Sequence, residues 1–537
     1  MPLAVADPMT ETRFPHFAAA APHLLAAESG RAVMAEGGNA VEAMLAMAAT
    51  IAVVYPHMNS LGGDGFWLIA DPKRRVRVID ACGGAGAKAT IASYREKGYD
   101  TIPSRGPLAA LTVPGAVGGF ALAFELAHAL GGRLPLGDIL ADATRLARDG
   151  FLVSASMARN EPSEFEGLAE APGFADIFLT EGQLPKAGTL LRQPALADTL
   201  AQLAHAGFMD FYRGDVGREI AADLAKIGSA VTREDLEAYR ASEREPLSVE
   251  LERGHLFNAP PPTQGLASLM ILALFERLGV ERAESFAHVH GLIEATKRAF
   301  AARNRIVTDF DRLKEDPASV LTKEHLDREA ALIDPRKAAP FGGAVPIGDT
   351  VWMGAIDGDG VAVSYIQSTY WEFGSGCVLP RTGLLMQNRG VSFSLDPGAL
   401  NPLEPGRRPF HTLNPPLALF KDGRVMSYGA MGGDGQPQFQ AELFTRHVYF
   451  GQPLYEAIDA PRWLLGRTWG KTKIDLTLEN RFDPNLVRAL EQAGHPVLVL
   501  DRAYDEGLGH VGALVSHRDG SIEAAHDPRS DGGALGG

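Results

Sequence analysis

Cysteine is scarce in this 537-residue chain, which contains only Cys82 and Cys377. Two cysteines cannot build a disulfide framework, so we expect both thiols to be reduced. The longest apolar run, residues 43–55, is too short to span a bilayer and is interpreted as a buried core helix. The first residues lack the basic and apolar segments of a secretory signal, and the sequence predicts a cytoplasmic protein.

Basic residues are in deficit. The 51 Lys and Arg residues stand against 66 Asp and Glu residues, which leaves a formal net charge of −15. Nucleic acids and anionic membranes select proteins with a basic face, so neither is predicted as a partner. A small molecule or a peptide is the expected substrate.

Several common site motifs are missing, including GxxxxGK[ST], GxSxG, HExxH and CxxC. The one metal-like spacing joins His288 and His290 with Glu294, but residues two apart point to different faces of a helix. Asp357 and Asp359 imitate the start of a calcium loop, yet no Glu stands at its twelfth position. We therefore expect no metal.

The chain is helix-rich first and strand-rich second. Its N-terminal part alternates helical patterns with short apolar runs, and residues 134–240 are mostly helical in pattern. Further helices are predicted over 265–278 and 287–306, and an exposed connection over 306–348. Strand and turn patterns dominate from residue 350 onward. This order predicts an α/β fold.

The strand-rich part begins with a hairpin pattern. Runs 350–357 and 361–368 are rich in β-branched and aromatic residues and flank a Gly-Asp-Gly turn. Glycine also allows backbone to approach a ligand closely, and three glycine clusters stand out, although each alone is more often a tight turn. They are residues 61–65, 82–86 and 431–438.

Five segments, in order along nearly the whole chain, resemble the γ-glutamyltransferase family of N-terminal-nucleophile hydrolases. They are residues 35–69 (from AEGGNAVEAM to GGDGFWLI), 111–151 (beginning LTVPGAVGGF), 258–269 (NAPPPTQGLASL), 349–368 (DTVWMGAIDGDGVAVSYIQS) and 407–438 (from RRPFHTLNPP to GGDGQPQ). The combination is far more specific than any one of them.

The resemblance implies a four-layer αββα fold made as an inactive precursor that cuts itself. The cleavage site corresponds to Asp349 and Thr350, giving a large subunit, 1–349, and a small subunit, 350–537. The two subunits would be intertwined in one structural domain, without a cofactor. Whether such units associate as a homodimer stays open.

The resemblance makes Thr350 the nucleophile. A threonine hydroxyl needs a base, and the α-amino group freed by cleavage, with a pKa of roughly 7.7 to 8.0, can serve as one. Gly432 and Gly433 match the paired N–H groups that the family uses for the oxyanion. The family also has a second hydroxyl downstream. Hairpin alignment puts Ile366 there, whereas counting from Thr350 puts Ser368, which is preferred because it can hydrogen-bond Thr350.

The substrate side departs from the best-known γ-glutamyl enzymes. Cys82 stands where their carboxylate-binding Arg would be, and His411 and Thr412 stand where paired serines would be. Val391 and Ser392 replace the acidic residue that holds the α-amino group. A guanidinium supplies both charge and fork geometry, so its loss indicates that γ-glutamyl compounds are not preferred.

The working hypothesis is hydrolysis of a small, oxamate-like amide through a Thr350 acyl-enzyme, as in the branch of the family that includes oxamate amidohydrolases. A true γ-glutamyl hydrolase or transferase acting on glutathione-like substrates is one alternative. The other is an unprocessed, catalytically silent binding protein, because sequence alone does not guarantee the strained geometry that self-cleavage requires.

Overall fold

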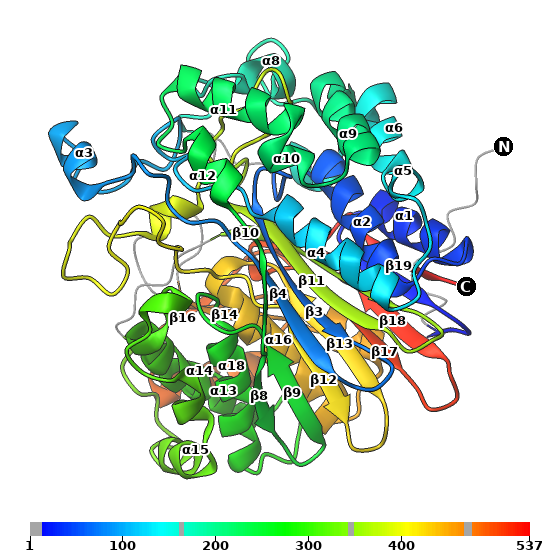
Figure 1. Cartoon of the computed structure of the whole chain (residues 1–537). Coiled ribbons are helices and arrows are strands. Elements are labelled where there is room, and N and C mark those ends of the chain that lie inside the picture. The colour runs from blue at the N-terminus through cyan, green and yellow to red at the C-terminus, as the bar shows by residue number, and fades with distance from the viewer. Residues whose placement is uncertain (1–12, 160–165, 342–347, 467–474) are drawn as a thin grey trace.

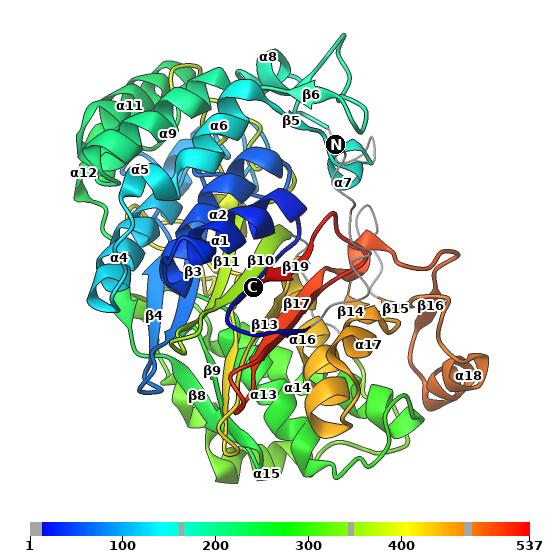
Figure 2. The ribbon, with the colours of Figure 1, turned by 90° about the vertical axis from the view of Figure 1, so that its right-hand side faces the viewer.

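Two seven-stranded sheets pack face to face, and helices cover the outer side of each (Figure 1, Figure 2). The computed structural model describes residues 13–159, 166–341, 348–466 and 475–537. The order of layers is helix, sheet, sheet, helix. The predicted αββα architecture is therefore confirmed.

The first sheet carries the predicted hairpin at its centre. Every strand in it is antiparallel to its neighbours. In spatial order the strands are β19 (Gly533–Gly536), β2 (Ala18–Ala21), β10 (Asp349–Ile356), β11 (Ala362–Tyr370), β3 (Asp64–Ala70), β4 (Val76–Ala81) and β7 (Ser242–Arg244).

The second sheet is built in the same antiparallel manner. Its strands are β1 (Arg13–Phe14), β18 (Ile522–His526), β17 (Val511–Ser516), β13 (Val425–Ala430), β12 (Leu417–Phe420), β9 (Gly254–Asn258) and β8 (Leu247–Glu250). Both sheets mix strands from before and after residue 350. The two halves of the chain therefore share one core.

Large apolar side chains fill the space between the sheets, among them Phe66, Trp352 and Leu514, all buried. The indole of Trp352 donates to the hydroxyl of Ser364 at 2.9 Å, so its polar atom is satisfied inside the core. An added Cβ at Gly429 would overlap that indole, which explains a glycine in the middle of β13.

Helix α2 (Ala40–Val54) lies in the layer over the first sheet and is buried along its whole length, as predicted for the apolar run. Asn39 caps its N-terminus, and Glu42 completes a capping box. Within the described residues, no helix has the length and apolar character needed to cross a membrane. The remaining helices before β7 are α1 (Leu24–Ala35), α3 (Ile91–Glu96), α4 (Ala116–Ala129), α5 (Leu136–Ile139), α6 (Ala141–Asp149), α7 (Ala155–Ala158), α8 (Phe174–Phe178), α9 (Pro194–Ala206), α10 (Asp210–Arg213), α11 (Asp215–Ile227) and α12 (Arg233–Ala238), with the short strand pair β5 (Phe151–Leu152) and β6 (Leu190–Leu191).

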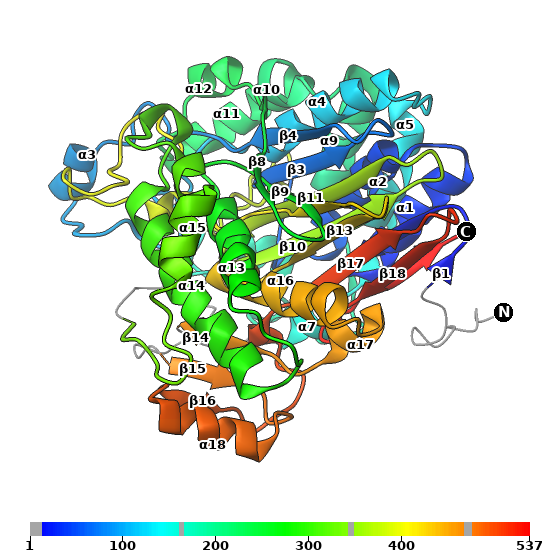
Figure 3. The ribbon, with the colours of Figure 1, turned by 90° about the horizontal axis from the view of Figure 1, so that it is seen from below.

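The layer over the second sheet contains α13 (Gly265–Arg277), α14 (Phe286–Ile306) and α16 (Gln436–Phe444) (Figure 3). The first two match the predicted helices. The connection after α14 is less irregular than predicted, because it contains α15 (Lys323–Ala330), whose Leu326 is buried against this layer. The periphery adds α17 (Leu454–Asp459), α18 (Pro484–Ala493) and a small sheet of β14 (Trp463–Gly466), β15 (Asp475–Leu478) and β16 (Val497–Val499).

Candidate active site

Thr350 is the second residue of β10 and lies at an irregularity in the strand pairing. Asp349 pairs with Tyr370, but Val351 pairs with Gln367, so β11 has one residue more than β10 at this point. Ile366 pairs with Trp352, farther along the strand. The register therefore places Ser368, and not Ile366, at the level of Thr350.

The hydroxyl of Thr350 lies at one end of a row of buried, hydrogen-bonded polar side chains. Gln436 Nε2 lies 3.4 Å from Thr350 Oγ1, and Gln436 Oε1 accepts from Asn414 Nδ2 at 3.0 Å. Asn258 Nδ2 in turn lies 3.4 Å from Asn414 Oδ1. All four side chains are buried. Sequence reasoning missed the glutamine and both asparagines, although each lies inside a motif that carried the family resemblance.

The hydroxyl of Ser368 contacts the backbone at the end of β11, and its predicted hydrogen bond with Thr350 stays a prediction. The Ser368 hydroxyl oxygen accepts from the backbone N–H of Tyr370 at 2.7 Å, while the Thr350 hydroxyl contacts Gln436. Tyr370 has a φ of +88°, a left-handed conformation that is unfavourable for a side chain of this size. Ser368 thus supports the strained turn at the end of β11, immediately beside Thr350.

The glycine pair forms the turn between β13 and α16. Gly432 and Gly433 have φ values of +114° and +53°, which favour glycine. The carbonyl of Gly432 accepts from Gly435 at 2.8 Å, and that of Gly433 accepts from Gln264 Nε2 at 2.9 Å. The N–H groups of the pair donate to no partner among the described residues. Two neighbouring N–H donors are therefore unused just before Gln436, and the oxyanion role of Gly432 and Gly433 stays a prediction.

A buried ion pair, Arg303 with Asp434, stabilises the glycine turn at residues 432–433. Arg303 Nη1 lies 3.0 Å from Asp434 Oδ1 and donates to Gln264 Oε1 at 2.7 Å. Burial raises the pKa of Asp434, and the positive charge of Arg303 opposes that rise. Gln264 connects the pair to the carbonyl of Gly433, so the backbone of the turn is held at several points.

Asp64 is the second buried polar centre, which sequence reasoning treated only as part of a glycine-rich turn. Its Oδ1 accepts from the N–H groups of Gly83 and Gly115 and from Gln387 Nε2, at 3.0 to 3.2 Å. His411 Nε2 lies 2.9 Å from Oδ2. Burial raises the pKa of Asp64 to about 7, against the effect of these donors.

The predicted substrate-binding residues divide into two groups. His411 contacts Asp64, and burial lowers its pKa well below the usual value, so its ring is neutral. Cys82 is a buried, free thiol directly after β4, and burial raises its pKa. The hydroxyl of Thr412 accepts from Arg389 Nη2 at 3.2 Å. Ser392, in contrast, donates to backbone carbonyls, so its hydroxyl serves the local turn.

His288 and His290, the two histidines considered as metal ligands, do not share a site. His288 Nε2 lies 2.9 Å from Thr445 Oγ1, whereas His290, Glu294 and His495 place one ligand atom each within 4.8 Å of one another. These atoms already have partners: His290 contacts His495 at 2.8 Å, and Glu294 accepts from Lys297 at 2.7 Å. An ammonium group within the cluster opposes binding of a cation.

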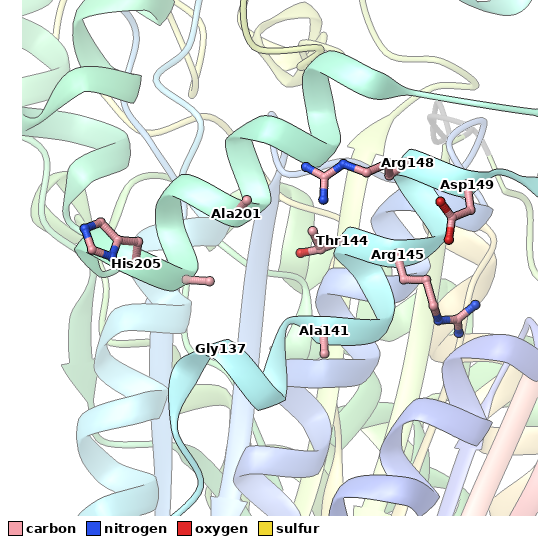
Figure 4. A pocket seen from close by; sticks show the side chains of 9 residues that line it. Gly137, Ala141, Thr144, Arg145, Arg148, Asp149, Ala201 and His205 are labelled. Carbon is pink, nitrogen blue, oxygen red and sulfur yellow. The ribbon is translucent and has the colours of Figure 1, made fainter.

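A surface hollow lies between α6 and α9 (Figure 4). It contains none of the residues named above. Its arginines are already engaged, since Arg145 pairs with Asp142 and Arg148 with Asp198. The hollow is therefore separate from the candidate active site.

The αββα layers, with a threonine near the start of a central strand in contact with the glutamine that follows a glycine turn, are those of the N-terminal-nucleophile hydrolase class. The chain belongs to the gamma-glutamyltranspeptidase family, whose model matches residues 26–537. It is accordingly a hydrolase of amide bonds made as a precursor of two subunits.

Individual relatives cover nearly the whole chain. The oxamate amidohydrolase proenzyme of Klebsiella pneumoniae is 51% identical, with 97% of this chain and 98% of the relative covered. The glutathione hydrolase-like YwrD proenzyme of Bacillus subtilis is 38% identical over 96% and 97%. The crystal structure of a cephalosporin acylase from Bacillus halodurans superposes with a TM-score of 0.89 at 31% identity, covering 98% of this chain and 96% of that one.

Proposed function

We propose that the chain cuts itself between Asp349 and Thr350 and that Thr350 then hydrolyses a small amide, with oxamate as the leading substrate. The observation that carries the proposal is the contact of Thr350 with Gln436, directly after a glycine turn with two N–H groups available. Residues 1–349 and 350–537 become the large and small subunits. Because both sheets contain strands of each, the subunits stay together after cleavage.

The chemistry of the mature enzyme follows from the new amino terminus. The Thr350 hydroxyl adds to the amide carbon while its proton passes to the neutral α-amino group. The carbonyl oxygen becomes an oxyanion, which the N–H groups of Gly432 and Gly433 stabilise. The C–N bond then breaks, and the ammonium returns the proton to the leaving nitrogen. Water, deprotonated by the same amine, opens the Thr350 ester and releases the acid.

The choice of a small, oxamate-like amide rests on two observations. The relative of 51% identity is an oxamate amidohydrolase proenzyme, and it matches this chain from end to end. Cys82 stands where γ-glutamyl enzymes have their carboxylate-binding arginine. It is a buried thiol, and in its neutral form it has no charge to offer. A γ-glutamyl α-carboxylate would lack its usual partner there.

A γ-glutamyl hydrolase is the second candidate, because the relative of 38% identity has a glutathione hydrolase-like name. Nothing in the described residues favours the third, an uncleaved binding protein. A cytoplasmic location and a possible association into homodimers remain predictions from the sequence.

Two measurements test the proposal. Intact mass spectrometry should show the 57.3 kDa chain replaced by two fragments that separate between residues 349 and 350. The processed enzyme should release ammonia from oxamate, with little release from γ-glutamyl-p-nitroanilide and little transfer to glycylglycine. Efficient γ-glutamyl transfer without oxamate hydrolysis would replace the first candidate by the second.

A further inference from the structure

Arg389 is a buried cation that the mechanism above does not use. It is the first residue of a 3₁₀ turn (Arg389–Ser392), and only 1% of it is exposed. Its Nη2 donates to Thr412, and its Cζ lies 3.8 Å from the ring centroid of Tyr370. Its Nε and Nη1 have no hydrogen-bond partner among the described residues. A planar anion fits along an edge of a guanidinium, where Nη2 and either Nε or Nη1 donate side by side, and Nη2 has a second hydrogen besides the one donated to Thr412.

Neither neighbouring carboxylate is hydrogen-bonded to this guanidinium. Asp64 already receives three donors on one oxygen and contacts His411 through the other. Asp434 lies against Arg303 instead. Burial lowers the pKa of Arg389 to about 10, which leaves it charged at neutral pH. A buried charge without a bonded counterion is costly, and such charges in proteins are normally paired.

Arg389 is connected to the glycine turn by a chain of hydrogen bonds. Its hydrogen-bond partner, Thr412, offers its carbonyl to Gln264 Nε2 at 2.7 Å, and the same nitrogen donates to the carbonyl of Gly433 at 2.9 Å. The guanidinium and the glycine turn are thus joined by two intervening residues. A small molecule that reaches both must carry its anionic group near its reacting carbonyl.

The aromatic ring over Arg389 also touches the segment that precedes the cleavage site. Tyr370 pairs with Asp349 across the strands, and a Cβ added at Gly348 would lie 2.8 Å from the Tyr370 ring. In the uncut chain, Gly348 therefore packs against the residue that stacks on Arg389. Departure of this end after cleavage would open space beside the guanidinium fork.

We propose that Arg389 binds the carboxylate of the substrate along one edge of its guanidinium, through the second hydrogen of Nη2 together with Nε or Nη1, and that the substrates are amides with a carboxylate directly attached to, or within two bonds of, the scissile carbonyl carbon. This rests on the proposed function of Thr350. It defines how the site would select oxamate-like acids: the carboxylate of a γ-glutamyl group lies too far along its chain. The guanidinium also offsets the repulsion between the carboxylate and the oxyanion that forms beside it.

The experiment compares Arg389→Gln and Arg389→Lys with the control Arg381→Gln, which removes a half-exposed arginine paired with Glu219. Each processed enzyme is assayed with oxamate and with oxamide, its uncharged diamide analogue. We expect kcat/KM for oxamate to fall on the order of 100-fold in Arg389→Gln and by less in Arg389→Lys, which keeps the charge but loses the fork. Oxamide hydrolysis should change less than about threefold, and the control should match the wild type.

Two results would overturn the assignment. One is an Arg389→Gln enzyme that keeps wild-type kcat/KM for oxamate. The other is an equal loss for oxamate and oxamide, which indicates a general structural role. If Arg389→Gln does not fold, Arg389→Lys decides: an unchanged KM for oxamate contradicts carboxylate binding, and a raised KM with normal oxamide turnover supports it.

A binding measurement separates this inference from the proposed function. If wild-type enzyme does not hydrolyse oxamate, the proposed substrate is wrong, and calorimetry with oxalate then tests Arg389 by itself. Oxalate binding to the wild type that is lost in Arg389→Gln supports the carboxylate site. Absence of oxalate binding to the wild type, or equal binding to both, refutes it.

Discussion

The amide of Gln436 is oriented by Asn414, so that its nitrogen, and not its oxygen, faces the hydroxyl of Thr350 at 3.4 Å. With the amide nitrogen as donor, the threonine oxygen must accept, and its own proton points elsewhere. This arrangement leaves the proton free to move to the α-amino group. Gln436 is therefore expected to position the nucleophile without exchanging protons itself.

Replacing Gln436 by Met should lower kcat about tenfold, because one oriented hydrogen bond contributes about 1.5 kcal/mol. KM should change little, since the side chain acts on Thr350 and not on the substrate. Steady-state kinetics on processed enzyme measure both constants. The matched control is Gln193→Met, which removes another buried glutamine, bonded to the carbonyl of Val53 at 2.8 Å. Equal kcat values for the two variants would refute the positioning role.

Thr350→Ala should abolish both self-cleavage and turnover, because the attacking oxygen is lost. Thr350→Ser keeps the hydroxyl and should retain part of each activity. Intact mass and ammonia release are the measurements, and a melting curve shows whether the alanine chain is folded. A folded Thr350→Ala protein that is still cut after residue 349 would mean that another residue is the nucleophile.

Asp64 should make the stability of the precursor depend on pH. Its pKa in the folded chain, about 7, lies above the ordinary value of 3.8, so the folded chain holds a proton that the unfolded chain has lost between these pH values. Its contribution to the free energy of unfolding is therefore largest at acidic pH and falls by about 1.4 kcal/mol per pH unit up to pH 7.

Asp64→Asn imitates the protonated acid at every pH and tests this expectation. In the Thr350→Ala background, which keeps one uncut chain, the variant should gain stability relative to its parent as the pH rises from about 4 to 7. Urea unfolding across this range measures the difference. A difference that is constant with pH would show that burial does not hold the proton on Asp64.

Ala339, ten residues before the proposed cleavage site, is held by the buried pair of Lys297 and Glu294. Lys297 Nζ donates to Ala339 O at 2.6 Å and to Glu294 at 2.7 Å, and Glu294 accepts from Ala339 N at 3.1 Å. The segment that leads to residue 349 thus begins from a defined point. We expect the double variant Glu294→Gln, Lys297→Met to cleave itself several-fold more slowly, because that anchor is weakened.

Changing both Glu294 and Lys297 avoids leaving one of them as an unpaired buried charge. A time course of fragment formation by denaturing electrophoresis measures the cleavage rate, with exposed Lys323→Met as the control. Oxamate turnover by the processed double variant should stay near that of the wild type. Cleavage at the wild-type rate would mean that the anchor does not guide the reaction.

Local patterns in the sequence predicted much of the fold. The apolar run became α2, and the runs around Gly358-Asp359-Gly360 became β10 and β11. Helical periodicity likewise located α13 and α14. These elements depend on residues that are close in sequence, so the spacing of apolar residues and the turn residues between them can be seen in the sequence. The assignment of Thr350 as nucleophile came from the family resemblance.

Other features depended on packing between distant segments. Asp64, Gln387 and His411 are far apart in sequence and meet because buried polar groups must satisfy one another. The extra residue in β11, which brings Ser368 level with Thr350, arises from the pairing of two strands and leaves no periodic signal.

The amino-acid sequence by itself determined the elements of this protein, their order and the family to which it is similar, because those depend on local propensity and on motifs. Only the tertiary structure decided that Gln436 contacts Thr350 and that Arg389 is buried with two nitrogens that have no partner in the described part of the chain. The physical reason is that burial and hydrogen-bond partners are properties of the folded core, where residues remote in the chain exclude water together.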